Sequence, residues 1–244
     1  MAYLKRRSQL AGCAILLGLM APWTAASAGV FSVTPVRLYM APRDRAVAVT
    51  LRNEGDAPIV LQADINVWKQ APNGTDELVL TDDLILAPPI IKLAPKAQQV
   101  VRLALLRPAD ASRQLTYRMI IREVPEAQPT PGVEVPIALA LSMPVFITPP
   151  TAKRQVNCDV EGRGGDKTIN LRCGNTGTAY GQIREATLAR NGQTLANFEG
   201  GSYILPGASK TIALKSDKSV GTGDAQLVIT FDDGQTLRTS VMLP

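Results

Sequence analysis

The side chains that most often carry catalysis are scarce in this sequence. The chain contains no histidine, so it lacks the usual proton carrier at neutral pH and the commonest metal ligand. The Ser-His-Asp and Cys-His arrangements of hydrolases are excluded for the same reason. Ser209 and Lys210 are neighbours in a predicted strand, where successive side chains point to opposite faces. The composition therefore predicts neither an enzyme nor a metal site.

Paired acidic residues and glycine-rich stretches are the next candidates for chemistry. Asp82–Asp83 and Asp232–Asp233 both stand in turn-like sequence, and so do the stretches GRGGD (162–166) and GTGD (221–224). None of them has the strand-turn-helix context of a phosphate-binding loop. We interpret them as solvated turns, because Asp and Gly supply the backbone angles that turns require.

The first 28 residues read as a secretory signal. Lys5, Arg6 and Arg7 precede an apolar run, and the small residues Ala-Ser-Ala follow it at 26–28. The run is shorter than the ~20 residues of a membrane-spanning helix, so we expect an exported, soluble chain without direct membrane insertion. Cys13 precedes the apolar run instead of following it, which argues against a lipoprotein. Without the three signal cations the formal charge falls from +5 to +2, too little to suggest nucleic acid as a partner.

Cys158 and Cys173 are the two cysteines left after the signal. In an exported chain such a pair favours a disulfide over a metal site. Predicted strands at 156–160 and 168–173 flank the turn EGRGGD, so the two sulfurs could join across a hairpin if they face one another.

The rest of the sequence has the pattern of an all-β protein in two domains. Short runs rich in Val, Ile, Leu and Thr alternate with turn residues, and helical patterns are almost absent. In the first half we predict strands near 30–40, 46–53, 59–69, 84–93, 98–105 and 115–124, which is typical of an immunoglobulin-like sandwich. The stretch TPPTAKR (148–154) interrupts the pattern. We therefore expect one domain over 29–150 and a second, also a β-sandwich, over 151–244.

One stretch of the first half is unusual. Every second residue between 133 and 143 is a sizeable apolar one, and the residues between are small or polar; the apolar row is Val133, Val135, Ile137, Leu139, Leu141 and Met143. Taken alone, such a row indicates a core strand. Pro136 cannot donate a ladder hydrogen bond, however, and therefore indicates an edge. Since a long apolar edge is normally blunted with charge or covered, this strand could serve to pair with another chain.

Five segments together resemble the PapD-like periplasmic chaperones of the chaperone-usher pathway. In order they are FSVTPVRLYM, AVAVTLRNEGDAPIVLQADINVW, APPIIKLAPKAQQVVRL, YRMIIREVP and the alternating strand that ends in PVFITPP. The resemblance implies two immunoglobulin-like sandwiches set at an angle with a cleft between them. The PVFITP ending is similar to that of the divergent branch of these chaperones, which assembles thin or spore-coat-U-like pili.

The resemblance also implies how a pilus subunit would be held. Such a subunit looks like a sandwich that lacks one strand, and donor-strand complementation fills its groove. The donor side chains would be Val135, Ile137 and Leu139, with Val133, Leu141 and Met143 extending the row. Arg37 stands where the family has an arginine that grips the subunit's C-terminal carboxylate. The family's second cation, a lysine, is replaced by Pro144, and Arg118 is the candidate substitute.

The partners implied by the resemblance are pilus subunits and an outer-membrane usher, in the periplasm and without a cofactor. Self-association of the free chaperone is left open by the sequence. An exported two-domain adhesin or structural pilus component is the alternative. That class should carry a donor extension at its mature N-terminus or an aromatic sugar pocket, whereas GVFSVTP leads directly into a strand pattern and aromatic residues are few.

Overall fold

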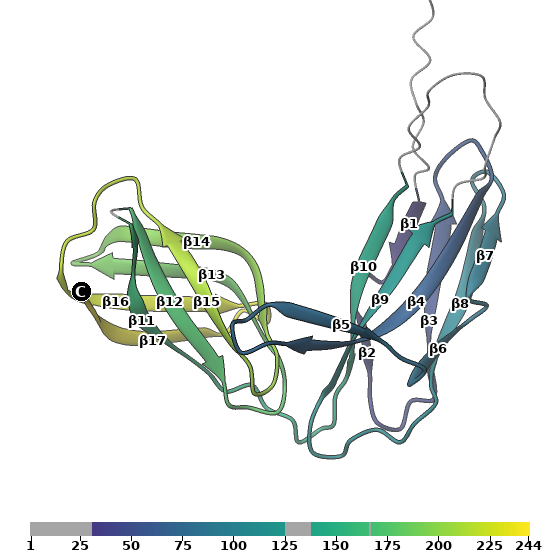
Figure 1. The fold of residues 1–244 in the computed structure, drawn as a ribbon, viewed down its shortest axis with the longest axis horizontal. Helices are drawn as coiled ribbons and strands as arrows, with labels where there is room; N and C mark the ends of the chain where they lie inside the picture. Colours follow the sequence, from purple (N-terminus) through teal and green to yellow (C-terminus); the bar gives the residue numbers. More distant parts are fainter. Residues whose placement is uncertain (1–30, 125–137, 166) are drawn as a thin grey trace, which may run out of the picture.

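The computed structural model describes residues 31–124, 138–165 and 167–244, and every regular element in these ranges is a β-strand. Two sandwiches meet at a corner and enclose an angle, as Figure 1 shows. The all-β, two-sandwich prediction is therefore confirmed. The strands are β1 (Phe31–Thr34), β2 (Leu38–Met40), β3 (Ala46–Asn53), β4 (Ile59–Gln70), β5 (Asp76–Leu80), β6 (Leu84–Ala87), β7 (Ile90–Leu93), β8 (Gln98–Leu105), β9 (Leu115–Glu123), β10 (Ala140–Ile147), β11 (Val156–Gly165), β12 (Thr168–Asn175), β13 (Gly181–Arg190), β14 (Gln193–Ile204), β15 (Ser209–Lys215), β16 (Gly223–Phe231) and β17 (Thr236–Leu243).

The first sandwich packs two sheets against each other. One sheet has the order β1-β3-β8-β6, and the other has the order β2-β10-β9-β4-β5, with β7 also pairing with β4. Alternate side chains of both sheets point inward and form one core, which includes Leu51, Leu103, Met119 and Ile121, none of them measurably exposed. This alternation is what the sequence pattern predicted.

Two segments that we predicted as single strands are each two strands in different sheets. The stretch 30–40 divides at Pro35 into β1, which pairs with β3, and β2, which pairs with β10. The stretch 84–93 divides at Pro88 and Pro89 into β6, which pairs with β8, and β7, which pairs with β4. Proline has no backbone N–H to give to a ladder, so pairing stops there and the chain crosses to the opposite sheet.

Strand β5 was not predicted from the sequence. It pairs with β4 from Asn66 to Gln70 and forms the outer edge of its sheet, and Gly74 takes a positive φ of 82° in the turn between the two strands. This hairpin extends from the first sandwich toward the second (Figure 1). Its tip touches the second sandwich, because a Cβ added to Gly74 would lie 2.9 Å from the Cγ of Lys210.

The second sandwich is one curled sheet with the order β11-β12-β15-β14-β13-β16-β17. Asn191 and Gly192 both have positive φ, 50° and 78°, as a two-residue hairpin turn of type I′ requires. Cys158 and Cys173 are register partners on β11 and β12 and form a disulfide, which confirms the predicted bridge. Strand β11 runs further into the glycine-rich stretch than expected, to Gly165, with register shifts after Val160 and Arg163.

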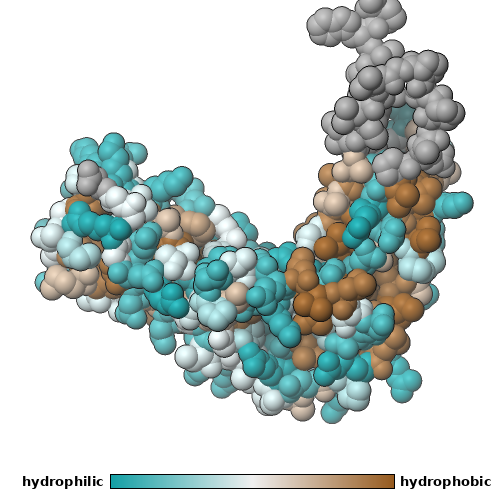
Figure 2. Space-filling model, in the orientation of Figure 1, coloured by the Kyte–Doolittle hydropathy of each residue, from teal (hydrophilic) through white to brown (hydrophobic). Residues whose placement is uncertain are grey.

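Apolar surface gathers on the first sandwich in Figure 2, whereas the second shows a mostly hydrophilic face in that view. Among the described residues, no helix is long and apolar enough to cross a membrane. The same part of the chain holds no cluster of acidic and cysteine side chains suited to a metal ion.

Candidate functional site

The corner between the two sandwiches is built on aromatic rings. Phe146 at the end of β10 stacks on Tyr180 with ring centroids 4.1 Å apart, and it also stacks on Tyr39 of β2 at 5.7 Å. Trp68 of β4 meets the ring of Tyr203 edge-on at 5.1 Å. Trp68 and Phe146 are almost completely buried. Offset and edge-on pairs of this kind are favourable beyond the area that they bury, so the corner has a packed core of its own.

Side-chain amides add hydrogen bonds between the two sandwiches. Gln70, the last residue of β4, donates to the carbonyl of Tyr203 and accepts from the N–H of Leu205, both at 2.9 Å. Gln114, which precedes β9, accepts from the N–H of Tyr180 at 2.9 Å and donates to Thr148 at 2.6 Å. Each glutamine thus satisfies backbone or side-chain groups that the corner removes from water.

Arg37 and Arg118, predicted from the resemblance, both lie at this corner. Their guanidinium carbons are 5.8 Å and 5.5 Å from the centroid of the same ring, that of Tyr203. Arg37 lies between β1 and β2, and Arg118 lies on β9. The structure therefore places on one aromatic ring two cations that are far apart in the sequence.

Arg118 also lies over the ring of Trp68, with 3.7 Å between its guanidinium carbon and the ring centroid. It is the register partner of Pro144 on β10. Burial lowers the pKa of Arg118, and the group nevertheless stays charged. Within the described part of the chain no carboxylate forms an ion pair with it. Arg118 is thus a half-buried cation that has an aromatic face but no counter-ion there.

Arg37 has a counter-ion from the second sandwich. Its Nη1 donates to Oδ2 of Asp232 at 2.7 Å, and 27% of the arginine side chain and 12% of the aspartate side chain are exposed. Burial alone would lower the pKa of Arg37, but the hydrogen bond to Tyr39 and the neighbouring Tyr203 and Tyr180 outweigh it, so the pKa is raised. The guanidinium is permanently cationic.

The acidic pairs lie in turns, as expected, but one aspartate of each pair is engaged in hydrogen bonds and an ion pair instead of being fully solvated. The Asp232 carboxylate is largely buried in the ion pair with Arg37. Asp83 accepts from Arg107 at 3.0 Å and from the Tyr117 hydroxyl at 2.9 Å. Asp82 fits the expectation, because it is exposed in the bend that precedes β6. Asp233 fits it in part, since 45% of its side chain is exposed although it pairs with Arg154 at 3.0 Å. The sequence offered no signal for these pairings, because in each pair the aspartate and its partner lie far apart in the sequence.

An open hollow of about 670 Å³ lies between the two sandwiches beside Arg37. Its lining combines both arginine-aspartate pairs with two tyrosines and smaller residues: Arg37, Tyr39, Met40, Ala41, Gln114, Thr148, Arg154, Ala179, Tyr180, Asp232 and Asp233. Such a lining suits an anionic group of a peptide, because guanidinium and phenol groups donate hydrogen bonds to a carboxylate.

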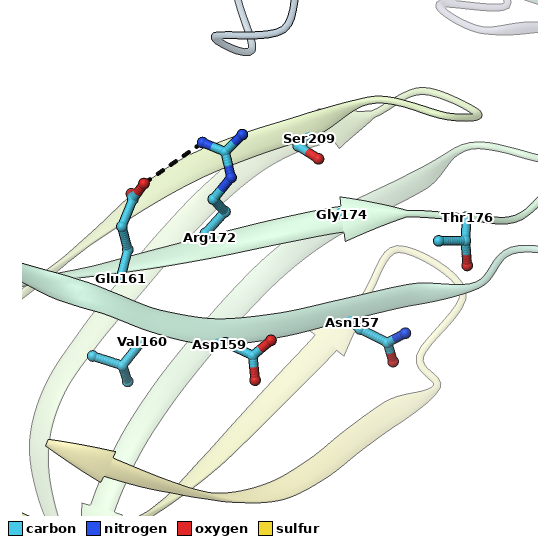
Figure 3. A pocket seen from close by; sticks show the side chains of 8 residues that line it. All are labelled: Asn157, Asp159, Val160, Glu161, Arg172, Gly174, Thr176 and Ser209. Atoms are coloured by element: carbon cyan, nitrogen blue, oxygen red, sulfur yellow. Dashed lines mark ion pairs between the residues drawn. The ribbon is translucent and has the colours of Figure 1, made fainter.

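A second hollow, of about 410 Å³, lies away from the corner on β11 and β12 of the second sandwich (Figure 3). Its side chains are small or polar, and the ion pair between Arg172 and Glu161 spans 3.5 Å with both groups about half exposed. Exposed pairs of this kind contribute little. Its lining offers no group that is poised for chemistry.

Only the C-terminal half of the row of predicted donor side chains lies within the described residues. Val133, Val135 and Ile137 lie outside the described residues. Leu139 is 37% exposed, Leu141 is half-buried against the core, and Met143 is 5% exposed in that core. Met143 therefore belongs to the chain's own core, which corrects its assignment to the donor row: its face is already covered by the opposite sheet.

Strand β10 has a free edge next to this row. It pairs with β9 along its whole length, from Ala140 to Ile147, but with β2 only from Val145 to Ile147. Among the described residues, no strand covers the other edge from Ala140 to Pro144. Backbone groups on such an edge are open to pairing with another strand.

Comparison with known proteins identifies the family. The model of "Pili and flagellar-assembly chaperone, PapD N-terminal domain" matches residues 30–153, just over half of the chain. The chain belongs to this family of pilus chaperones. The resemblance seen in the sequence is thereby confirmed, and the family points away from an enzyme. No curated protein matches the chain.

Solved structures share the fold of this pilus chaperone over most of its length. The CsuC-CsuE chaperone-tip adhesion subunit pre-assembly complex from archaic Csu pili of Acinetobacter baumannii matches with 18% identity and a TM-score of 0.65, covering 87% of this chain and 98% of that chain. The E. coli chaperone DraB matches with 17% identity and a TM-score of 0.58, covering 90% of this chain and 98% of that chain. The Salmonella enterica SafA pilin in complex with the SafB chaperone matches with 16% identity and a TM-score of 0.58, covering 90% of this chain and 99% of that chain.

Proposed function

We propose that this chaperone holds a pilus subunit in the periplasm by donating the free edge of β10 and delivers it to an outer-membrane usher. The observation that carries the proposal is that edge, which β2 leaves uncovered from Ala140 to Pro144. A strand added there would extend the β2-β10-β9-β4-β5 sheet, and its backbone would pair with β10 as in other cases of strand addition.

The apolar row supports the same proposal. Burial falls along the row from Met143 through Leu141 to Leu139, so the row leaves the chaperone's own core and continues toward the open edge. The side chains at these alternate positions would enter the core of a subunit bound at that edge. Fully burying one such side chain stabilises by about 1.5–3 kcal/mol, and part of this is offset by the entropy of association. We propose Val133, Val135, Ile137, Leu139 and Leu141 as the donor residues.

The second contact in the proposal is an anchor for the subunit's C-terminal carboxylate. Arg37 lines the hollow between the sandwiches, and Arg37 and Arg118 both lie near the ring of Tyr203. Arg118 has no counter-ion in the described part of the chain. A guanidinium offers paired, charge-assisted hydrogen bonds to a carboxylate. With its carboxylate fixed at the corner, the last strand of the subunit would run along β10 in one register.

Two of the similar structures are complexes with partners of the same kind. One is a complex with a tip adhesion subunit of archaic pili, and the other is a complex with a pilin. Both support a pilus subunit as the ligand, and the first favours the archaic, spore-coat-U-associated branch for this chain. We also propose that residues 1–28 are removed on export, and that the two domains span 29–150 and 151–244.

The test is a pull-down of subunits encoded beside this gene, co-expressed in a periplasm with the chaperone. Leu139→Asp places a charge in the donor row at an exposed position, and Ala138→Asp places the same charge on the adjacent exposed residue, whose side chain points to the other face. We expect Leu139→Asp to lose the subunit and Ala138→Asp to keep it. Equal behaviour of the two variants, both folded, would refute strand donation.

Arg37→Ala separates the two contacts. If the carboxylate anchor holds, this variant should recover at most about a tenth of the subunit recovered with the wild type. A pull-down by Arg37→Ala as full as that by the wild type would leave strand donation standing and remove the anchor. If no subunit depends on the chaperone at all, the proposed function fails as a whole.

A further inference from the structure

Asp232 reaches from the second sandwich to the proposed carboxylate anchor. It follows β16 in the turn that leads to β17, where its N–H donates to the carbonyl of Gln182 at 3.0 Å and Gly234 takes a φ of 80°. These contacts fix the backbone of the turn. The side chain is therefore presented to Arg37 by a rigid hairpin and not by a loose loop.

The carboxylate of Asp232 is held as a bound anion would be. Its Oδ2 accepts from Nη1 of Arg37 at 2.7 Å and from the hydroxyl of Tyr180 at 3.0 Å. The hydroxyls of Tyr39 and Tyr180 are 2.8 Å apart. Because Tyr180 gives its proton to the carboxylate, Tyr39 must be the donor to Tyr180. One cation and a relay of two phenols thus converge on a single oxygen atom.

Arg37 still has donors to offer. Both of its hydrogen bonds, to Asp232 and to Tyr39, use Nη1. Among the described residues, none accepts from its Nε or Nη2. A guanidinium carries five N–H donors in a planar fork, so a second carboxylate can approach the remaining edge. Asp232 and an incoming carboxylate would then share one cation.

We propose that Asp232 is an internal carboxylate that competes for Arg37 and sets how tightly the anchor holds the C-terminal carboxylate of a subunit. The inference rests on the proposed function and adds to it the residue that limits its affinity. Two carboxylates on one guanidinium repel each other, and each receives only part of the cation's hydrogen-bonding capacity. Asp232 keeps Arg37 paired in the free chaperone and weakens the bound state, which favours release of the subunit.

A positioning role for Asp232 makes the opposite prediction. If the aspartate served to hold Arg37 in a productive orientation, its removal would weaken the binding of a carboxylate. If it served only as an interdomain contact, its removal would lower stability and leave carboxylate binding unchanged. The sign of the change in affinity therefore separates the three roles.

The experiment uses residues 29–244 and two probes of identical sequence, a short apolar peptide with a free C-terminal carboxylate and its C-terminal amide. Trp68 is the only tryptophan after the signal and touches Arg118, so its fluorescence reports binding at the corner. Asp232→Asn is close in shape to the wild type, and Asp232→Ser removes the charge with a shorter side chain. Asp224→Asn is the matched control, with the same change of charge at the far, exposed end of β16.

We expect both Asp232 variants to bind the free carboxylate about tenfold more tightly, which corresponds to about 1.4 kcal/mol. The amide should bind equally to all variants, and Asp224→Asn should match the wild type. Unchanged or weaker carboxylate binding in folded Asp232 variants would overturn the inference while leaving the anchor intact. A wild type that does not distinguish carboxylate from amide would overturn the anchor itself, and this inference with it.

Discussion

The ring of Phe146 lies almost parallel to that of Tyr180, with centroids 4.1 Å apart and an interplanar angle of 13°. Phe146 is the second-to-last residue of β10, and Tyr180 belongs to the loop that precedes β13 in the second sandwich. The strand that we propose to be donated is thus tied at its C-terminal end to the corner of the molecule. One stacked pair therefore links the position of the free edge to the orientation of the second domain.

Truncation of Phe146 should loosen that link. Phe146 is fully buried, so Phe146→Ala should lower the free energy of unfolding by about 3–5 kcal/mol and widen the distribution of angles between the sandwiches. Denaturant unfolding measures the first effect and small-angle scattering the second. Phe146→Leu keeps most of the volume and should lose only about 0.5–1.5 kcal/mol for the stacking. Equal losses in the two variants, with unchanged scattering, would contradict a role in the corner.

The side chain of Gln70 should stabilise the contact between the two sandwiches through its hydrogen bonds. Gln70→Ala removes the partners of the Leu205 N–H and the Tyr203 carbonyl, which should cost about 1–3 kcal/mol for the buried groups left unpaired. Hydrogen exchange is the direct measurement, because the Leu205 amide should lose protection. Gln62→Ala is the control on the same strand, since among the described residues the Gln62 side chain bonds only to Asp64, within the first sandwich. Retained protection of Leu205 in Gln70→Ala would show that water or another group takes over its hydrogen bond.

The pairing of strands was predictable where the signal is local. Asn-Gly, as at 191–192, is the dipeptide typical of a two-residue hairpin turn, and Cys158 and Cys173 flank a single predicted turn; the structure shows the hairpin turn and the disulfide. The splits at Pro35 and Pro88 were missed although the prolines were visible, because a crossing between sheets depends on which strand lies opposite.

The corner was less predictable than the strands. The resemblance supplied Arg37 and Arg118, whereas Asp232 was interpreted as part of a solvated turn, and Tyr180 and Trp68 were not singled out. Their importance arises from contacts between segments far apart in the chain, such as the 195 residues that separate Arg37 from Asp232. No periodicity within one segment encodes such a pair, so only the assembled structure could reveal it.

The disulfide should stabilise the second sandwich. Cys158 and Cys173 enclose a loop of 15 residues in sequence, and closing such a loop is worth about 3 kcal/mol in the chain-entropy account. The double variant Cys158→Ser with Cys173→Ser should therefore melt at a lower temperature, and reduction of the wild type by a thiol should give the same shift. A wild type whose melting temperature is insensitive to reduction and to the double substitution would contradict this expectation.

Alkaline pH should weaken the corner through its tyrosines. The pKa of Tyr180 is raised, first by burial and then by its hydrogen bond with Tyr39 and the negative charge of Asp232. A group whose pKa is higher in the folded state than the unfolded value of about 10 contributes stability that is fully present below pH ~10 and is lost as the pH rises toward the folded pKa. Burial likewise raises the pKa of Tyr117 and Tyr203. Urea unfolding at pH 8 and pH 11 should therefore show a marked loss of stability.

Tyr180→Phe isolates the share of that loss that arises at the corner. Phenylalanine cannot ionise, so the difference in unfolding free energy between pH 8 and pH 11 should be smaller in this variant, while the contributions of Tyr117 and Tyr203 persist. Tyr117→Phe is the control, because Tyr117 bonds to Asp83 inside the first sandwich: it should reduce the alkaline loss without changing the angle between the sandwiches. Absorbance near 295 nm should show one late-titrating tyrosine fewer in each variant. An alkaline loss of the same size in Tyr180→Phe and the wild type would mean that Tyr180 ionises as easily in the folded as in the unfolded chain, which would contradict its burial between Tyr39 and Asp232.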